Sequence, residues 1–273
     1  MPVKKLKPIT PGTRFRLAPD FSLLTNSKPE KNLLISVKKT AGRNNTGKKT
    51  MHYRGGGSKK RMRIIDFGRS KHNIWGTVKT IEYDPMRSAY ISLLWYEDGE
   101  KRYILYPKGL KVGDKVISGE QVDPEIGNAM PLKSIPMNTS VHNIALDPNK
   151  HGIMVRSAGA SAELVGKEGK YVVIKLPSGE VRKILGTCMA TVGTVGNVDH
   201  SNVRLGKAGR KRNMGRLPRV RAVAKNPVDH PMGGGEGKAS GGIPRSKNGI
   251  PAKGKRTRSL KKASNKLIIK RRK

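Results

Sequence analysis

The residues with the clearest chemical potential lie near position 230, where Asp229 directly precedes His230 and a glycine run follows. A carboxylate that orients an imidazole is the pairing that hydrolases use to activate a serine or a cysteine. Residues adjacent in sequence rarely reach that geometry, and no nucleophile accompanies this pair. We therefore expect no catalytic residue here. An RNA-processing or acyl-transfer enzyme that uses Asp229 and His230 is kept as an alternative hypothesis.

The glycine run resembles a phosphate-binding loop but departs from its pattern. It covers residues 233–238, with Met232 where the first glycine of such a loop belongs and Ala239 where Ser or Thr belongs. No strand pattern precedes it. The run is better interpreted as a flexible tract that lets the backbone approach a partner closely.

Metal and cofactor chemistry are not indicated by the remaining candidates. The six histidines do not pair at zinc-ligand spacing with one another or with the single Cys188, so we expect no metal ion and no cofactor. One cysteine also excludes a disulfide framework. Because Cys188 lies among apolar residues, we expect an inert thiol in a folded core.

The overall charge indicates a polyanionic partner. The 273 residues include 57 Lys and Arg against 19 Asp and Glu, which gives a net charge of +38, and only 4% are aromatic. No apolar run approaches the roughly 20 residues of a membrane helix, so we expect no membrane partner. Nucleic acid is the natural partner for such a charge. A DNA-compacting protein is the second alternative, since charge alone permits it.

The charge lies mainly at the two ends of the chain. Residues 1–63 contain 17 basic and 2 acidic side chains, residues 64–203 contain 17 and 15, and residues 204–273 contain 23 and 2. Eight of the twelve aromatic residues fall between Phe67 and Tyr106, and none follows Tyr171. The ends cannot bury enough apolar surface to offset their ordering entropy. We expect a folded centre with two basic extensions that take shape against an anion.

The central region has the spacing of two small β-structures. Alternating apolar residues over 91–95 lead to Asp98-Gly99, and a second apolar run follows over 102–105. Residues 112–117 are expected to add a strand. The same pattern recurs over 172–176, Ser178-Gly179 and 182–185, after a proline-bounded stretch at 131–136. We predict two small β-barrels in tandem, and because helical patterns are scarce we expect only short turns outside the strands.

Several segments, in order along the chain, closely resemble the large-subunit ribosomal protein two family, of the bacterial or organellar type. They are Gly42-Arg43-Asn44-Asn45, Gly55-Gly56-Gly57, Tyr83-Asp84-Pro85, Asp98-Gly99-Glu100-Lys101-Arg102-Tyr103-Ile104, Arg156-Ser157-Ala158-Gly159, Gly206-Lys207-Ala208-Gly209-Arg210 and Asn226-Pro227-Val228-Asp229-His230-Pro231. The stretch from 226 to 237 is the most specific, and the resemblance covers nearly the whole chain.

The resemblance implies an all-β fold with long basic, irregular N- and C-terminal extensions. Its parts are a basic extension over 1–63, an OB-fold RNA-binding barrel over 64–130, an SH3-like barrel over 131–203 and a Gly/Pro-rich extension over 204–273. It further implies a non-enzymatic structural constituent of the large ribosomal subunit and a primary rRNA-binding protein. That role supports subunit association, tRNA binding and assembly of the peptidyl transferase region.

The implied partners are large-subunit rRNA, neighbouring ribosomal proteins, the small subunit at a bridge and, indirectly, tRNA. No homo-oligomer is expected. We expect the cytoplasm of a bacterium as the location, and an organelle-encoded ribosome is the alternative, because the chain begins where the family begins and shows no transit peptide.

The resemblance also assigns site residues. Two arginines tied to RNA binding in the family fall on Arg87 and Arg156, and a histidine near the peptidyl transferase centre falls on His230. With the basic runs of the chain, the expected rRNA-binding residues are Arg43, Lys59, Lys60, Arg61, Arg87, Arg156, Lys207, Arg210, Lys211, Arg212, Arg219, Arg221, Lys255, Arg256 and Arg258. The residues expected near the peptidyl transferase centre are Asp229, His230, Gly233, Gly234 and Gly235.

Some positions depart from the family pattern. Met232 stands where many members have a second histidine, and Met86 stands where asparagine is usual. Tyr53 and Ser58 replace histidines that often flank the triple glycine, and Asn213 replaces a common tryptophan. These departures indicate a divergent lineage.

Overall fold

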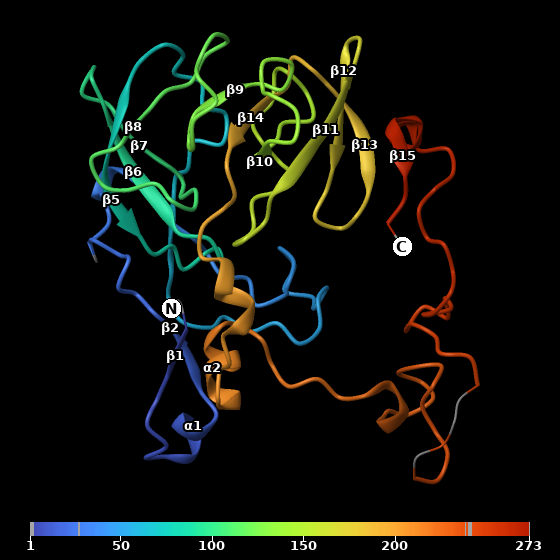
Figure 1. Cartoon of the computed structure of the whole chain (residues 1–273). Helices are drawn as coiled ribbons and strands as arrows, with labels where there is room; N and C mark the ends of the chain where they lie inside the picture. The colour runs from blue at the N-terminus through green and yellow to red at the C-terminus, as the bar shows by residue number, and fades with distance from the viewer. Residues whose placement is uncertain (1–2, 27, 238, 240–241, 273) are drawn as a thin grey trace. The chain divides into compact units, whose positions relative to one another are not determined.

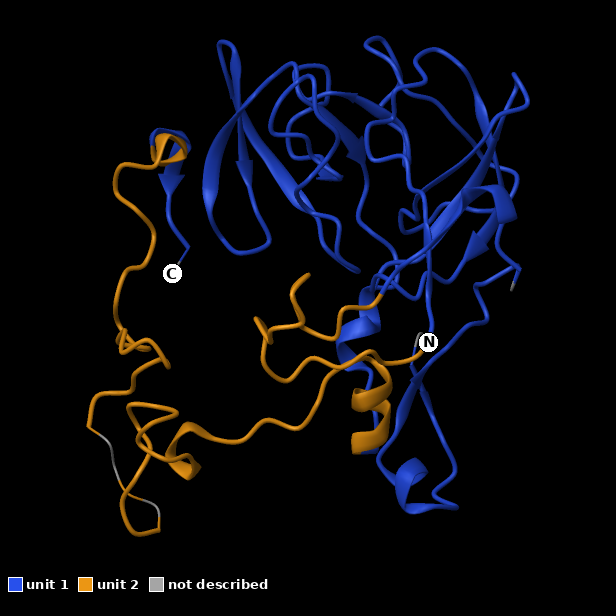
Figure 2. Cartoon of the chain, turned by 180° about the vertical axis from the view of Figure 1, so that it is seen from behind, with its two compact units in different colours: residues 1–38, 59–207, 266–273 blue, residues 39–58, 208–265 orange. Residues whose placement is uncertain are grey.

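The computed structural model describes residues 3–26, 28–237, 239 and 242–272. The chain divides into two compact units (Figure 2). Unit 1 comprises Met1–Lys38, Lys59–Lys207 and Lys266–Lys273, and unit 2 comprises Lys39–Ser58 and Ala208–Asn265. The four-part division expected from the sequence stays a prediction.

The first sheet of unit 1 contains four antiparallel strands in the order β7-β6-β5-β8 (Figure 1). Their bounds are β5 (Gly76–Glu82), β6 (Ile91–Tyr96), β7 (Lys101–Leu105) and β8 (Lys115–Val116). The β6–β7 turn is the predicted one, and Gly99 adopts the positive φ of 84° that the tight turn requires. Ile65 adds a parallel bridge to Tyr103 of β7. Apolar side chains of the sheet, including Val78, Leu94 and Ile104, form a buried core.

The predicted strand over 112–117 is shorter than expected. Only Lys115 and Val116 pair with β5, because the residues before them form a turn. The Asp114 carboxylate accepts a hydrogen bond from the backbone N–H of Lys111 at 2.7 Å, and Gly113 has a φ of 99°. The turn interrupts the strand pairing there, although the Gly113 N–H and the Asp114 carbonyl still hydrogen-bond to the backbone of Val78 in β5, at 2.8 and 2.9 Å.

The second sheet contains seven antiparallel strands in the order β15-β13-β12-β11-β10-β14-β9. Their bounds are β9 (Ala129–Pro131), β10 (Ser140–His142), β11 (Ala162–Glu168), β12 (Tyr171–Lys175), β13 (Val181–Leu185), β14 (Met189–Val192) and β15 (Ile268–Lys270). The β12–β13 hairpin turns at Ser178-Gly179, as predicted. Cys188 lies fully buried in the core of this sheet, and burial raises the pKa of its thiol to about 11.

The basic ends contain short regular elements. Near the N-terminus, β1 (Val3–Lys5) pairs with β2 (Leu17–Pro19) around the helix α1 (Pro11–Arg14), and β3 (Leu34–Ser36) pairs with β4 (Arg61–Arg63). In the C-terminal region, β15 pairs with β13 at the edge of the second sheet (Figure 1). Nothing in the sequence indicated this pairing. The 3-10 helices cover Lys31–Leu33, Val198–Asn202, Ala222–Ala224 and Ala263–Leu267.

Unit 2 is built around the helix α2 (Ala208–Asn213) and a close approach of two backbone segments. Gly55 donates to the Gly215 carbonyl at 2.9 Å, and Ser58 donates to the Asn213 carbonyl at 2.8 Å. At Gly57, whose φ is 62°, a Cβ would lie 2.6 Å from the Asn213 carbonyl oxygen. The triple glycine therefore permits this pairing, and two departures from the family pattern, Ser58 and Asn213, meet in it.

The predicted all-β class is confirmed, with an OB-fold barrel followed by an SH3-like barrel. The helices are short, with four residues in α1 and six in α2. Within the described residues, no helix has the length and apolar character needed to cross a membrane.

Candidate nucleic-acid interface

Arg87 and Arg156 lie 69 positions apart in the sequence and meet at one aromatic ring in unit 1. The guanidinium carbon of Arg156 lies 4.2 Å from the Phe67 ring centroid, and that of Arg87 lies 5.3 Å from it. Phe67 itself packs against the buried side chains of Ala89, Leu105 and Val195. Two residues that only the family resemblance singled out thus form one cluster, here named the Phe67 cluster (Arg87, Phe67, Arg156).

The turn at residues 84–87 orients Arg87. The Asp84 side chain is fully buried, and its two carboxylate oxygens accept from Arg87 Nε at 2.6 Å and from the Met86 backbone N–H at 2.9 Å. A carboxylate held this way fixes the near end of the guanidinium. The two terminal nitrogens of Arg87 have no acceptor among the described residues, so they remain available to a ligand.

Arg156 has no carboxylate partner in the described part of the chain. Its partial burial lowers the pKa of the guanidinium, and the positive charge of Arg87 lowers it further. Val155, immediately before it, adopts a φ of 55°, a region that β-branched residues rarely enter. The two cations of the Phe67 cluster are therefore balanced by only one carboxylate, that of Asp84, and the net positive charge favours an anion such as a phosphate.

Hydrogen bonds between the loops of the two sheets hold the Phe67 cluster in place. Asn143 Nδ2 donates to the Phe67 carbonyl at 3.1 Å, and the Asn143 N–H donates to the Val155 carbonyl at 2.9 Å. On the other side, the Ser88 carbonyl accepts from Asn197 Nδ2 at 2.6 Å. Nothing in the sequence singled out these positioning residues. Their positive φ values of 51° and 57°, which asparagine tolerates best after glycine, are seen only in the folded chain.

A second aromatic position was also missed. Trp95 on β6 is 44% exposed, and the ammonium groups of Lys79 and Lys101 lie 5.2 and 4.8 Å from its ring centroid. Exposed aromatic rings flanked by cations are typical of surfaces that stack on bases. The alternation over 91–95 placed Trp95 on the same face of the strand as Ile91 and Leu93, which are buried, and gave no sign of its exposure.

His230 lies in a compact turn of unit 2. It is 9% exposed, and its Nδ1 accepts the Met232 backbone N–H at 3.1 Å, so the exposed Asp229 does not orient this nitrogen. A Cβ on Gly233 would overlap the carbonyls of Lys225 and Asn226. The glycines thus serve a tight local turn, and among the described residues no group of three or more His, Cys, Asp or Glu side chains is arranged for a metal ion.

The other predicted rRNA-binding residues are mostly exposed cations. In unit 1 these are Lys59, Lys60, Arg61 and Lys207, and in unit 2 they are Arg43, Arg210, Lys211, Arg212, Arg219, Arg221, Lys255, Arg256 and Arg258. Only Lys60 and Arg210 are half-buried. Arg219 lies within 6.0 Å of the Tyr53 ring centroid, and Lys225 lies within 5.8 Å of it. Their contacts with RNA stay predictions.

Two short-stranded β-barrels with polycationic segments define a class of protein that binds folded RNA. Comparisons with known proteins identify the family. Residues 30–118 match the model "Ribosomal Proteins L2, RNA binding N-terminal domain", and residues 125–249 match "Ribosomal Proteins L2, C-terminal domain".

Full-length bacterial relatives indicate the same family. The chain is 63% identical over 273 residues to "Large ribosomal subunit protein uL2" of Amoebophilus asiaticus, with all of both chains covered. It is 58% identical over 272 residues to the protein of that name in Cytophaga hutchinsonii, covering all of this chain and 98% of the relative. The chain belongs to the ribosomal protein L2 family, and it is a ribosomal protein with an rRNA-binding role.

Proposed function

We propose that the chain is a primary rRNA-binding protein of the bacterial large ribosomal subunit that supports subunit association, tRNA binding and assembly of the peptidyl transferase region. The observation that carries this proposal is the Phe67 cluster. It presents two guanidinium groups from loops that hydrogen bonds already hold in place before RNA binds. Arginine is well suited to phosphate because its planar fork donates two parallel hydrogen bonds.

The four expected parts have different tasks in this proposal. The OB-fold barrel over 64–130 and the SH3-like barrel over 131–203 dock specifically through Arg87 and Arg156. The extensions over 1–63 and 204–273 neutralise phosphates along the RNA. His230 and the glycines after it position RNA or aid assembly near the peptidyl transferase centre, where the RNA carries out peptide transfer. Neighbouring ribosomal proteins and the small subunit complete the partners, in the bacterial cytoplasm.

Replacing Arg156 with Ala tests this function. Loss of hydrogen bonds from a charged group costs about 1.5–3 kcal/mol, so affinity for a large-subunit rRNA fragment should fall roughly 10- to 100-fold. Arg87→Ala should lose a similar factor, but it also leaves the buried Asp84 unpaired, so its thermal unfolding must be measured in parallel.

Lys270→Ala is the matched control, because Lys270 is an exposed cation on β15. Filter binding should show a loss of about threefold or less for this variant. Equal losses for Arg156→Ala and Lys270→Ala would remove the special status of the Phe67 cluster. Preference for duplex DNA in competition would favour the DNA-compacting alternative, and turnover by RNA-free protein would favour the enzyme.

A further inference from the structure

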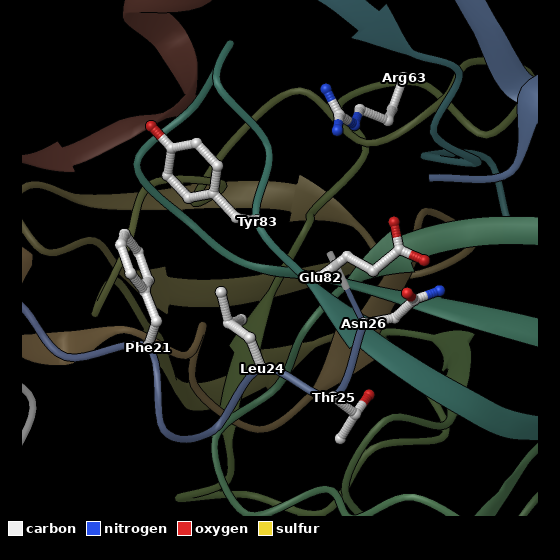
Figure 3. Close-up of a pocket in the computed structure, with 7 residues that line it drawn as sticks. All are labelled: Phe21, Leu24, Thr25, Asn26, Arg63, Glu82 and Tyr83. Carbon is white, nitrogen blue, oxygen red and sulfur yellow. The ribbon is translucent and has the colours of Figure 1, made fainter. Parts of the chain in front are cut away.

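A pocket opens in unit 1 beside the end of β5 (Figure 3). Three stretches of the chain form it: residues 21–26, Arg63 of β4, and Glu82-Tyr83 at the end of β5. Its volume is about 670 Å³, within the range of sites that hold small organic groups. None of the residues predicted to bind rRNA lines it.

The pocket is anchored to the first sheet. The Thr25 backbone N–H donates to the Ile81 carbonyl at 3.1 Å, and the Ile81 N–H donates to Thr25 Oγ1 at 2.9 Å. Leu24 packs onto the core of that sheet. Because segment 21–26 is held at both backbone and side-chain level, the pocket exists before any ligand arrives.

One wall of the pocket is aromatic. Phe21 and Tyr83 meet edge to face, with ring centroids 5.6 Å apart, and both rings are about half exposed (Figure 3). Half-exposed aromatic rings are costly in water, and RNA-binding proteins use such rings to stack on bases that have left the helix. This wall is therefore suited to a flat, apolar-faced group.

The opposite side carries two groups of opposite charge. Glu82 is 2% exposed, and its oxygens accept from Thr80 Oγ1 at 2.9 Å and from the Tyr103 hydroxyl at 2.8 Å. Each carboxylate oxygen can accept a second hydrogen bond. Burial raises the pKa of Glu82, and the charge of Arg63 opposes this shift.

Arg63 is left with unused donors. Its Nη1 donates to the Arg61 carbonyl at 3.2 Å, and its buried Nε has no partner. Although it faces the same pocket as Glu82, no ion pair joins them among the described residues. A ligand that bridges the two must offer an acceptor to Arg63 and donors to Glu82.

We propose that this pocket binds one unstacked guanine base of the rRNA, against the rings of Phe21 and Tyr83, between Arg63 and Glu82. The proposal rests on the rRNA-binding role and adds a base-specific contact to it. Guanine offers the O6 acceptor beside the N1–H and N2–H donors on one edge, which matches an arginine beside a carboxylate. A phosphate would be repelled by Glu82, and a basic side chain would be repelled by Arg63.

Uncharged nucleosides test the pocket without interference from phosphate binding. Saturation-transfer NMR on the full-length protein, in about 0.5 M potassium chloride to screen the extensions, should show guanosine binding at least fivefold above uridine. Inosine, which lacks the N2 amino group, should fall between them. Equal signals for guanosine and uridine would overturn the proposal.

Three variants locate the binding. Phe21→Ala, Arg63→Gln and Glu82→Gln should each reduce the guanosine signal at least fivefold, whereas Phe15→Ala removes an exposed phenylalanine outside the pocket and should leave it unchanged. Phe21 is exposed, so its variant is expected to fold, and thermal unfolding confirms this for each protein. Retained guanosine binding in a folded Phe21→Ala protein would contradict the assignment.

The large subunit provides the second test. With Phe21 replaced by the photoreactive p-benzoylphenylalanine, irradiation of assembled subunits should crosslink the protein to one guanosine of the rRNA. A crosslink to another base or to a protein would overturn the proposal. Filter binding of wild-type protein and Arg156→Ala to rRNA is run alongside, so that failure of the pocket is distinguished from failure of rRNA binding as a whole.

Discussion

The two units each place a pair of cations around one aromatic ring, but they support that pair differently. In unit 1, the Phe67 cluster is backed by a fully buried carboxylate and by hydrogen bonds from loops of both sheets. In unit 2, Arg219 and Lys225 lie about 6 Å from the Tyr53 ring, and the Tyr53 hydroxyl reaches the Val220 carbonyl at 3.4 Å. Arg219 is exposed, and neither cation has a carboxylate partner among the described residues.

This difference separates two ways of binding a polyanion. A cation held by buried groups keeps its geometry before binding, so little ordering entropy is lost when the ligand arrives. Exposed cations on an irregular backbone supply charge, and their contribution depends on ion release and therefore on salt. The Phe67 cluster of unit 1 is built for the first mode, and the exposed cations of unit 2 for the second.

The largest difference is expected in the free energy of unfolding when a methyl group is added at Gly196 of unit 1 or at Gly209 of unit 2. In unit 1, a Cβ on Gly196 would overlap the Tyr106 ring, which is 6% exposed and packed in the core. Gly196→Ala should therefore destabilise the protein by about 3 kcal/mol. In unit 2, a Cβ on Gly209 in α2 meets nothing within 4 Å, so Gly209→Ala should be neutral or stabilise by up to about 1 kcal/mol. Urea unfolding measures both, and equal effects would contradict the contrast.

An effect of about the same size is expected from acidification, and it too belongs to unit 1. His142 on β10 is 1% exposed, its Nδ1 lies 2.8 Å from the Gly193 carbonyl oxygen, and burial, with a smaller effect from Arg69, lowers its pKa from 6.5 to about 4. The unfolded chain binds a proton below about pH 6.5 while the folded chain does not. Stability is therefore full above pH 6.5 and falls as the pH approaches 4, by on the order of 3 kcal/mol.

Substitution separates His142 from the carboxylates that also titrate in acid. His142→Gln should flatten the loss of stability between pH 6.5 and 4.5, whatever its effect at pH 7. His72→Gln is the control, because His72 is exposed. Identical pH profiles for His142→Gln and the wild type would show that His142 takes up its proton equally in the folded and unfolded states, contradicting the lowered pKa.

Local signals explain what the sequence could predict. The Asp98-Gly99 and Ser178-Gly179 hairpins were predicted because the glycine of each turn supplies a positive φ, observed as 84° and 82°. The expected burial of Cys188 was also confirmed, and it was predicted from the apolar residues around it. Each of these features is encoded within about ten residues.

Contacts between distant segments could not be predicted in this way. Arg87 and Arg156 were identified only through the family resemblance, and nothing near either residue indicated that both would meet Phe67. The pairing of β15 with β13 depends on an open sheet edge that only the folded protein presents. The pocket at Phe21 likewise joins three stretches separated by up to 62 positions.

The smallest expected effect concerns salt and tests the contrast most directly. Replacing Lys255 and Arg256, both exposed in unit 2, with Ala should remove about two phosphate contacts and reduce the salt slope of rRNA binding by roughly 1.5. The loss should be about tenfold near 50 mM salt and shrink as salt rises. Arg156→Ala removes one phosphate contact, so it should reduce the slope by only about 0.8. It should still lose affinity several-fold at high salt, because its hydrogen bonds are positioned before binding. Filter binding across a salt series measures both slopes. If the Arg156→Ala loss disappeared at high salt, the Phe67 cluster would act as charge alone, and the distinction between the two units would fail.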